Sequence, residues 1–217
     1  SAPESSKEQA ALIVTIQTVG EIAQLRPHLF EGHAGEVYAF ALRLLPPVKE
    51  KAKKKVEAEK KMSKAAQASL CQVHTRALKM LVKSCLAEST DSEVVASTSK
   101  RAKELVQLLD GLLRKEARDI DVQLVLAAAA SLVRLASKHD ALLTPPVFFQ
   151  LAGVLRHPNP TVRVGVLRKL KKAFNRSRLG LKYAALLAMY AVDPVKEYQH
   201  TAMTTLTQVV KVFRARA

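Results

Sequence analysis

A short turn rich in proline and asparagine constrains the fold of this chain more than any other feature. It follows an apolar helical segment that runs from Phe148 to Leu155. Asn159 offers a helix cap and Pro160 a first-turn proline, so a second helix is predicted to begin there. That helix repeats apolar residues at Val162, Val166, Leu170 and Phe174. Two such helices cannot bury their apolar faces alone, so they must stack on neighbouring pairs.

The rest of the chain divides into helices of the same kind. Periodicity, caps and prolines predict nine helices, over residues 6–26, 34–45, 66–86, 98–116, 119–138, 145–155, 160–174, 181–192 and 194–213. Paired as outer and inner helices, they give about four helical pairs plus one leading helix, at the period of a HEAT repeat. The predicted fold is an all-α HEAT-repeat α-solenoid, with residues 1–217 in a single array. The chain starts at Ser1 without a visible signal peptide, and we expect a fragment of a longer solenoid.

Residues 49–64 differ from their surroundings in composition. They contain eight lysines and three glutamates and almost no apolar side chain. Because such a segment has little surface to bury, we predict a lysine-rich insertion that is disordered or exposed to solvent.

The two cysteines, Cys71 and Cys85, fall in one predicted helix. Fourteen helical residues separate them by about 21 Å, which is far beyond the reach of a disulfide. Both lie among apolar residues, so we predict buried free thiols and a reducing compartment, either the cytosol or the nucleus. No apolar run is long enough to predict a membrane span.

The sequence offers no constellation of residues that is typical of an enzyme. It has no nucleophile elbow, phosphate-binding loop or dinucleotide fingerprint. The sequence Gly32-His33-Ala34-Gly35 is best interpreted as a turn, and His28 and His33 have too few neighbouring ligands to predict a metal site. We therefore predict a non-enzymatic binding protein with no metal and no required cofactor.

A strongly basic surface is the clearest candidate for binding. The formal net charge is +16, and no Asp or Glu occurs between Ala141 and Val192. The helix dipole explains cations near a helix C-terminus, such as Lys171 and Lys172, but it does not explain the missing acids. The alternative is that these side chains only solvate the surface. We predict one continuous anion-binding or partner-binding patch, formed by Arg168, Lys169, Lys171, Lys172, Arg176, Arg178 and Lys182.

Arg163 is interpreted differently, because on a helical wheel it lies beside the apolar face. We predict a structural role between repeats, through hydrogen bonds to neighbouring carbonyl groups.

Several segments in order resemble one family, the cohesin regulators named for precocious dissociation of sisters. The sequence Asp193-Pro194-Val195-Lys196-Glu197 matches the family's D-P-x-K-E turn. Val162-Arg163 followed by Lys169-Leu170-Lys171-Lys172 is similar to its Q-V-R helix. Further similar segments are Leu143-Thr144-Pro145 with Phe148 and Leu151, Leu181 to Ala188, Ala77 to Val82, and Val19 to Phe30. Val166, Lys171 and Gly180 depart from the family pattern, which indicates a divergent member.

The resemblance implies a non-enzymatic scaffold that regulates sister chromatid cohesion on chromatin in the nucleus. It implies three partners: the kleisin subunit of cohesin, a Wapl-like release factor and the cohesin acetyltransferase. Some members carry inositol hexakisphosphate in a basic pocket, so this ligand and direct DNA binding are alternative uses of the basic surface. A generic HEAT adaptor is the third possibility.

Overall fold

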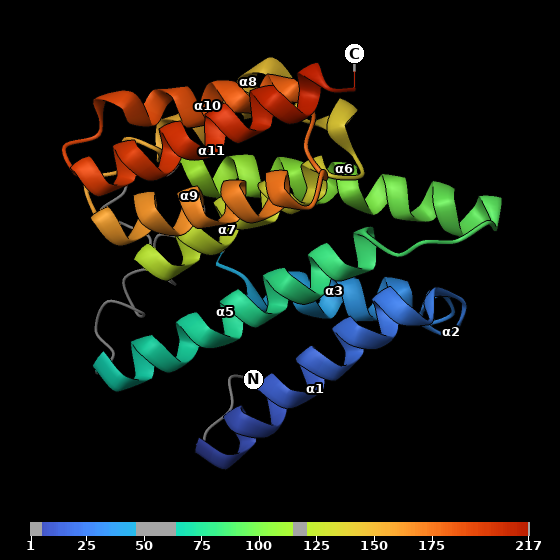
Figure 1. Ribbon diagram of the computed structural model, residues 1–217. Helices are drawn as coiled ribbons and strands as arrows, with labels where there is room; N and C mark the ends of the chain where they lie inside the picture. The colour runs from blue at the N-terminus through green and yellow to red at the C-terminus, as the bar shows by residue number, and fades with distance from the viewer. Residues whose placement is uncertain (1–5, 47–63, 115–120, 217) are drawn as a thin grey trace.

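The computed structural model describes residues 6–46, 64–114 and 121–216, and every regular element in these ranges is a helix (Figure 1). The all-α prediction is confirmed. The α-helices are α1 (Ser6–Leu25), α2 (Pro27–Glu31), α3 (Ala34–Leu44), α5 (Lys64–Cys85), α6 (Ser92–Arg114), α7 (Val122–Ala136), α8 (Pro145–Val154), α9 (Pro160–Asn175), α10 (Ala184–Ala188) and α11 (Lys196–Arg214). Short 3₁₀ turns precede α8 and flank α10, at η2 (Asp140–Leu142), η3 (Leu181–Tyr183) and η4 (Met189–Val192).

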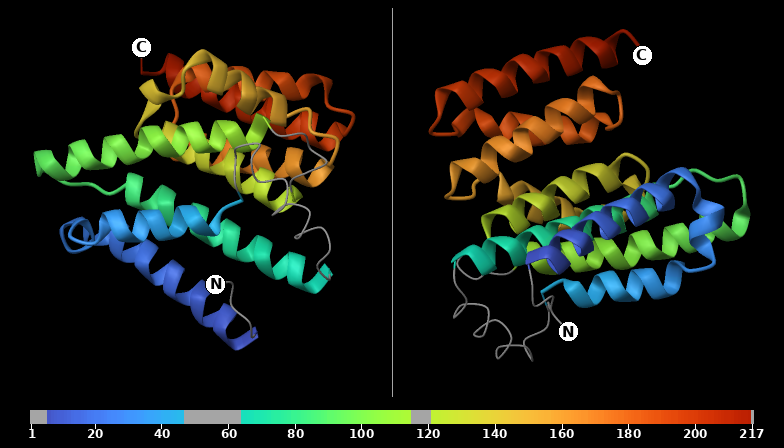
Figure 2. Two further views of the ribbon diagram at one scale, coloured as in Figure 1. Left: turned by 180° about the vertical axis from the view of Figure 1, so that it is seen from behind. Right: turned by 90° about the horizontal axis from the view of Figure 1, so that it is seen from below.

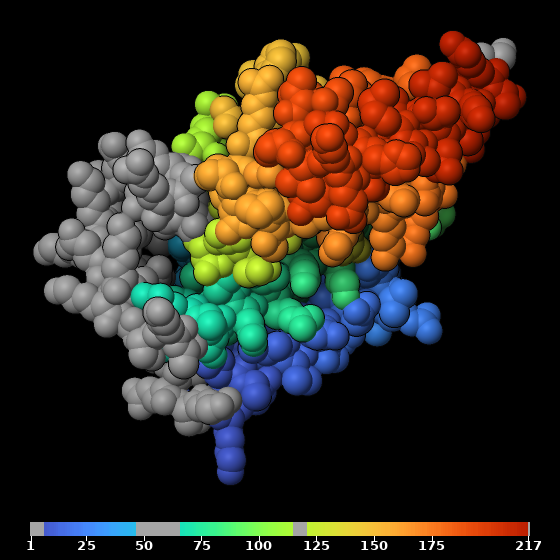
Figure 3. Space-filling view, turned by 60° about the vertical axis from the view of Figure 1, so that its left-hand side comes forward, coloured from blue at the N-terminus to red at the C-terminus, as the bar shows by residue number. Residues whose placement is uncertain are grey.

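The helices stack in two rows. Along the inner row, α1 packs on α5, α5 on α7, α7 on α9 and α9 on α11. Seen from behind, α3, α6 and α8 form the outer row (Figure 2). The space-filling view shows the same succession on the surface, from α1 in blue to α11 in red (Figure 3). This arrangement is consistent with the predicted HEAT-like repeats.

One buried apolar cluster runs through the stack from Ile16 in α1 to Val209 in α11. Its centre is α7, where Ala128, Ala129 and Leu132 have no exposed surface. The small alanines let neighbouring helices approach closely, as the apolar sequence of this helix predicts. Each repeat therefore buries its apolar face against the next, which is how a solenoid obtains its stability.

Close packing between α7 and α9 depends on a glycine. A Cβ atom added at Gly165 would lie 2.5 Å from Cδ1 of Leu126, which is inside van der Waals contact. Gly165 thus leaves the room that the Leu126 side chain occupies between these two inner helices.

Side-chain caps fix where several helices begin. Asn159 Oδ1 accepts a hydrogen bond of 2.8 Å from the backbone N–H of Thr161, as predicted for the start of α9. Asp121 Oδ1 caps α7 in the same way, by accepting from the N–H of Gln123. These bonds satisfy backbone donors that have no partner within the helix.

The helix predicted over 98–116 begins earlier than predicted, because α6 starts at Ser92. Asp91 Oδ1 accepts a 2.9 Å hydrogen bond from the N–H of Glu93 and acts as a cap, so the helix begins six residues before the predicted start. The periodicity of the first two predicted helices places Ile22 and Phe40 on the buried face, and the structure corrects both positions. Ile22 is 41% exposed and Phe40 is 43% exposed, while Ala23 and Tyr38 beside them are buried.

The C-terminal region departs from the predicted pair of regular helices. The helix predicted over 181–192 is a 3₁₀ turn, the short α10 and a second 3₁₀ turn. The last helix begins at Lys196 rather than at Pro194. Asp193 Oδ1 accepts from the N–H of Val195, so this carboxylate holds a turn before the helix rather than its first helical residues.

The lysine-rich segment predicted over 49–64 lies outside the described residues, except for Lys64, where α5 begins. The division of the chain into a single array stays a prediction. Cys71 and Cys85 are both buried and free, as predicted. Within the described ranges, each helix is too short or too polar to cross a membrane.

Candidate anion-binding site

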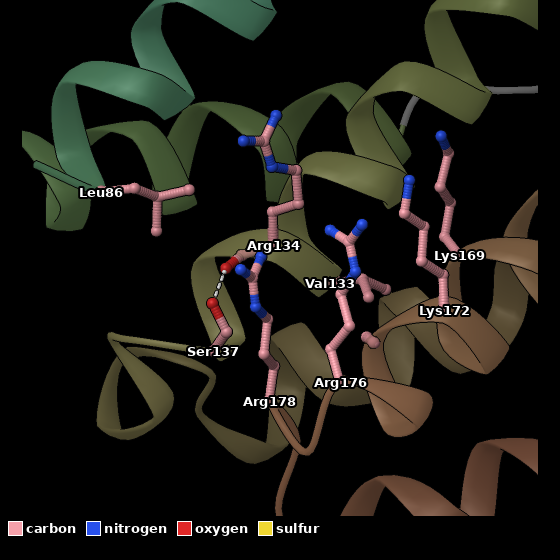
Figure 4. A pocket seen from close by; sticks show the side chains of 9 residues that line it. Leu86, Val133, Arg134, Ser137, Lys169, Lys172, Arg176 and Arg178 are labelled. Carbon is pink, nitrogen blue, oxygen red and sulfur yellow. Dashed lines mark hydrogen bonds between the residues drawn. The ribbon is translucent and has the colours of Figure 1, made fainter. Parts of the chain in front are cut away.

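Five basic side chains meet around a pocket of about 280 Å³ between α5, α7 and α9. Arg134 comes from α7, while Lys169, Lys172 and Arg176 come from α9 and its C-terminal cap. Figure 4 shows that the side chains from α9 and Arg178 extend toward the side of the pocket where the Arg134 guanidinium lies. We call this site the basic pocket; it is also lined by Leu86, Val133, Ser137 and Ala173.

The spacing of the residues on α9 explains why they line one wall. Lys169, Lys172 and Arg176 are three and four residues apart, so they lie on the same face of the helix. About a quarter turn away, the same helix carries Val162, Val166 and Leu170, which are fully buried. The apolar stripe therefore orients the basic stripe toward the pocket.

A left-handed residue brings Arg178 back to the same wall. Ser177 has a φ of 53°, and in the described residues it is the one non-glycine residue with a positive φ. The N–H of Arg178 then donates a 3.0 Å hydrogen bond to the carbonyl of Ala173. This is a common way to end a helix, and here it places Arg178 close to Arg134.

The five cations of the basic pocket have no salt-bridge partner among the described residues. Burial lowers the pKa of Arg134, the positive charge of Arg178 lowers it further, and the negative charge of Glu21 acts in the opposite direction. Arg134 is half-buried and the other four cations are exposed, so a bound anion would relieve the repulsion between these like charges.

The basic surface continues from α7 to α5. A smaller pocket of about 70 Å³ is lined by Arg134 and by three basic residues of α5, which are Arg76, Lys79 and Lys83. Burial lowers the pKa of Lys79, and the charges of Arg76, Lys169 and Arg134 act in the same direction. Lys83 is ion-paired with Glu21, and Arg76 donates a 3.0 Å hydrogen bond to Gln17. Arg134 lines both pockets and thus connects them, with Lys79 in the smaller one.

The seven predicted patch residues fall into separate groups. Lys169, Lys172, Arg176 and Arg178 line the basic pocket. Arg168 and Lys171 are exposed but do not line it. Lys182 forms a 2.8 Å salt bridge with Asp140, and its Nζ lies 5.3 Å from the centre of the Tyr183 ring. Binding at any of these residues stays a prediction.

Arg134 and Lys79 were missed by the sequence interpretation. Arg134 was a detectable signal, since it is a single arginine within a helix that is otherwise almost wholly apolar. A charged side chain on such a buried helix must extend to solvent or to a polar site, because burial of an unpaired charge is costly. Lys79 carried no comparable signal, because exposed lysines are common on helices.

Arg163 occupies a different place, in the turns that join consecutive repeats. It is 7% exposed, and its Nη1 donates to the carbonyls of His157 at 2.9 Å and Pro158 at 3.2 Å. Its Nε donates to Asp193 Oδ2 at 2.7 Å. The backbone carbonyl of Arg163 accepts from the Tyr190 hydroxyl at 2.7 Å. One arginine therefore contacts both the α8–α9 turn and the turn before α11.

Within the described part of the chain, no three His, Cys, Asp or Glu side chains are grouped to hold a metal ion. The burial of Cys71 and Cys85 raises the pKa of these thiols to about 12 and about 11. Cys71 also donates a 3.1 Å hydrogen bond to Asp121 Oδ1. Both groups are therefore protonated near neutral pH, which disfavours a role as thiolate nucleophiles.

Comparison with known proteins gives a consistent result. Residues 3–217 match the family described as "Sister chromatid cohesion protein PDS5 protein". The chain is 28% identical over 211 residues to sister chromatid cohesion protein PDS5 homolog B-B of Xenopus laevis, covering 94% of this chain and 14% of the relative. It is 29% identical over 145 residues to PDS5 homolog A of Homo sapiens, covering 64% of this chain and 11% of the relative. The chain thus spans only a small part of the length of these relatives.

Proposed function

Because this chain belongs to the PDS5 family of sister chromatid cohesion proteins, we propose that it forms part of a scaffold that binds the kleisin subunit of cohesin. The family regulates cohesion without enzymatic activity. A stacked helical array suits this role, since it offers a long surface to an extended partner. The single observation that carries the proposal is the basic pocket, where five cations without a salt-bridge partner among the described residues meet on the inner row.

In the proposed mechanism, the protein first binds kleisin through opposite charge and then holds the bound segment where other factors can reach it. The basic pocket attracts an acidic stretch of kleisin, and the array holds that stretch beside further factors. By family resemblance, those factors are a Wapl-like release factor and the cohesin acetyltransferase. The protein then influences whether cohesin opens or stays closed, and it acts on chromatin in the nucleus.

A binding assay with charge-reversal variants tests this proposal. Lys169→Glu, Lys172→Glu and Arg176→Glu together reverse three charges of the basic pocket and are expected to weaken kleisin binding at least tenfold. The matched control carries Arg168→Glu and Lys171→Glu, on the same helix but outside the pocket. The control should bind kleisin within about twofold of the parent chain, and both proteins should melt close to the parent temperature, because exposed charges contribute little to folding. Equal binding by the pocket variant and the parent would overturn the proposal.

Direct binding of DNA or inositol hexakisphosphate is the second candidate, and the same five cations favour it. Salt dependence separates it from kleisin binding. A DNA ligand that contacts several phosphates would lose affinity steeply with salt, with a slope close to −0.9 for each phosphate contacted in a duplex. If the pocket variant loses DNA or inositol phosphate binding and keeps kleisin binding, this second function replaces the first.

A further inference from the structure

We propose that the basic pocket binds an extended peptide with one apolar anchor residue and acidic residues about three positions before and after it. This inference rests on the proposed function and specifies the chemistry of the partner segment. It follows from the lining of the pocket, from its size, and from the distribution of basic residues over three inner helices.

The lining combines an apolar part with a basic part. Leu86 and Ala173 are half-buried and Val133 is 2% exposed, so these side chains form an apolar floor. The same pocket is lined by the basic groups of Arg134, Lys169 and their neighbours, and Figure 4 shows Leu86 at one edge and the two lysines at the other. A wholly polar polyphosphate would satisfy the basic groups and leave the floor in contact with water. A leucine or methionine side chain would cover the floor while neighbouring carboxylates meet the cations.

The size of the pocket agrees with a side chain rather than with a larger ligand. Its volume of about 280 Å³ lies at the lower end of the range for small-molecule sites, which begins at about 300 Å³. A DNA duplex is too wide to enter and could contact only the basic rim. The floor therefore favours a peptide that inserts one residue.

The distribution of charge sets the spacing of the acidic residues. Basic groups occur on α5 at Lys79, on α7 at Arg134 and on α9 at Lys169, so they lie on both sides of the central helix. Packed helices are about 8–10 Å apart, and an extended peptide advances about 3.3 Å per residue. A peptide that crosses the inner row therefore meets a new helix about every three residues.

Fluorescence anisotropy with labelled peptides on the complete chain tests this inference. The test peptide is Glu-Asp-Ser-Ser-Leu-Ser-Ser-Asp-Glu. The first control replaces the leucine by serine at equal charge, and the second moves all four acidic residues to one end. A leucine side chain loses its contact with water on binding and a serine side chain gains little from the apolar floor, so the serine peptide should bind at least tenfold more weakly. The peptide with displaced acids should also bind more weakly than the test peptide.

A variant with a larger side chain in the apolar floor gives a second, independent test of peptide affinity. Ala173→Phe occupies the floor without changing any charge and should weaken the leucine peptide while leaving the serine peptide unchanged. The melting temperature of this variant shows whether it is folded. If the variant is unstable, the comparison of the three peptides on the parent chain still tests the inference. Equal affinity of the leucine and serine peptides would overturn the inference. So would binding of inorganic tripolyphosphate or duplex DNA that is tighter than that of the leucine peptide and insensitive to Ala173→Phe.

The outcomes separate this inference from the proposed function. If charge reversal abolishes kleisin binding and Ala173→Phe leaves it intact, kleisin is held by charge alone, so the inference fails and the proposed function survives. In the opposite outcome, the leucine peptide binds more tightly than both control peptides while the affinity for kleisin is the same in the parent and in every pocket variant. In that case the inference holds and the proposed function fails.

Discussion

Replacing Arg163 by alanine should destabilise the C-terminal repeats strongly. The guanidinium forms a salt bridge with Asp193 at 2.7 Å, and the two side chains are 9% and 3% exposed. It also donates to two carbonyl groups of the α8–α9 turn. Arg163→Ala therefore removes both the pair and the connection between two turns, and it leaves the Asp193 carboxylate buried with only the N–H of Val195 as a partner for Oδ1.

The expected magnitude follows from the burial of the pair. Removing one partner of a buried salt bridge costs about 3–5 kcal/mol, because the remaining charge loses its compensation. A typical domain is stable by only about 5–15 kcal/mol, so this change is a large share of the total. Asp193→Ala should be similarly costly. The double variant should cost about 1–3 kcal/mol less than the sum of the two single variants, since both remove the same interaction.

Urea denaturation followed by circular dichroism gives the free energies for this cycle. Hydrogen exchange locates the effect, and faster exchange is expected in α9 and α11 but not in α1. Arg168→Ala is the matched control, because this arginine is an exposed neighbour on α9 and should change stability by less than about 0.5 kcal/mol. A cost below about 1 kcal/mol for Arg163→Ala, with unchanged exchange in α11, would refute the structural role of this residue.

Four further predictions concern stability. Gly165→Ala forces the half-buried Leu126 side chain to move, so it should raise the melting temperature by less than its gain of about 1 kcal/mol in helix propensity would. Gly153→Ala meets no atom within 4 Å and should raise the melting temperature by the full gain in propensity. Asn159→Ala removes the α9 cap and should cost about 1 kcal/mol in urea denaturation, while a Ser substitution restores most of it. Burial raises the pKa of Cys71 to about 12 and of Cys85 to about 11, so the unfolded thiols ionise first and stability should fall as the pH rises above about 8.5. Denaturation midpoints at pH 8 and 9.5 measure this fall, and replacing both cysteines by alanine should reduce it.

Local signals predicted most of the helices, because caps and prolines act over a few residues. The start of α9 at Pro160 was predicted from Asn159, and the cap bond is present. The start of α6 was missed since Asp91 stands in a run of polar residues, where several side chains could act as the cap. Which side chain does so depends on where the preceding helix ends, and that depends on tertiary packing.

The candidate site was predictable only in part. The absence of acids between 141 and 192 identified α9 as basic, and the wheel separated its two faces. The meeting of α9 with Arg134 required the order in which the inner helices stack, which the sequence of either helix does not contain. The separate position of Lys182 likewise depends on Asp140, a partner 42 residues away in sequence.

The succession of inner helices has a mechanical consequence. Each inner helix contacts its immediate neighbours, so a force that separates α1 from α11 acts on every interface in series. Small rotations at each interface add up to a large change in curvature, as in a soft spring. A ligand that spans α5, α7 and α9 would lock two adjacent interfaces at once, and it would stiffen the middle of the array while both ends stay compliant.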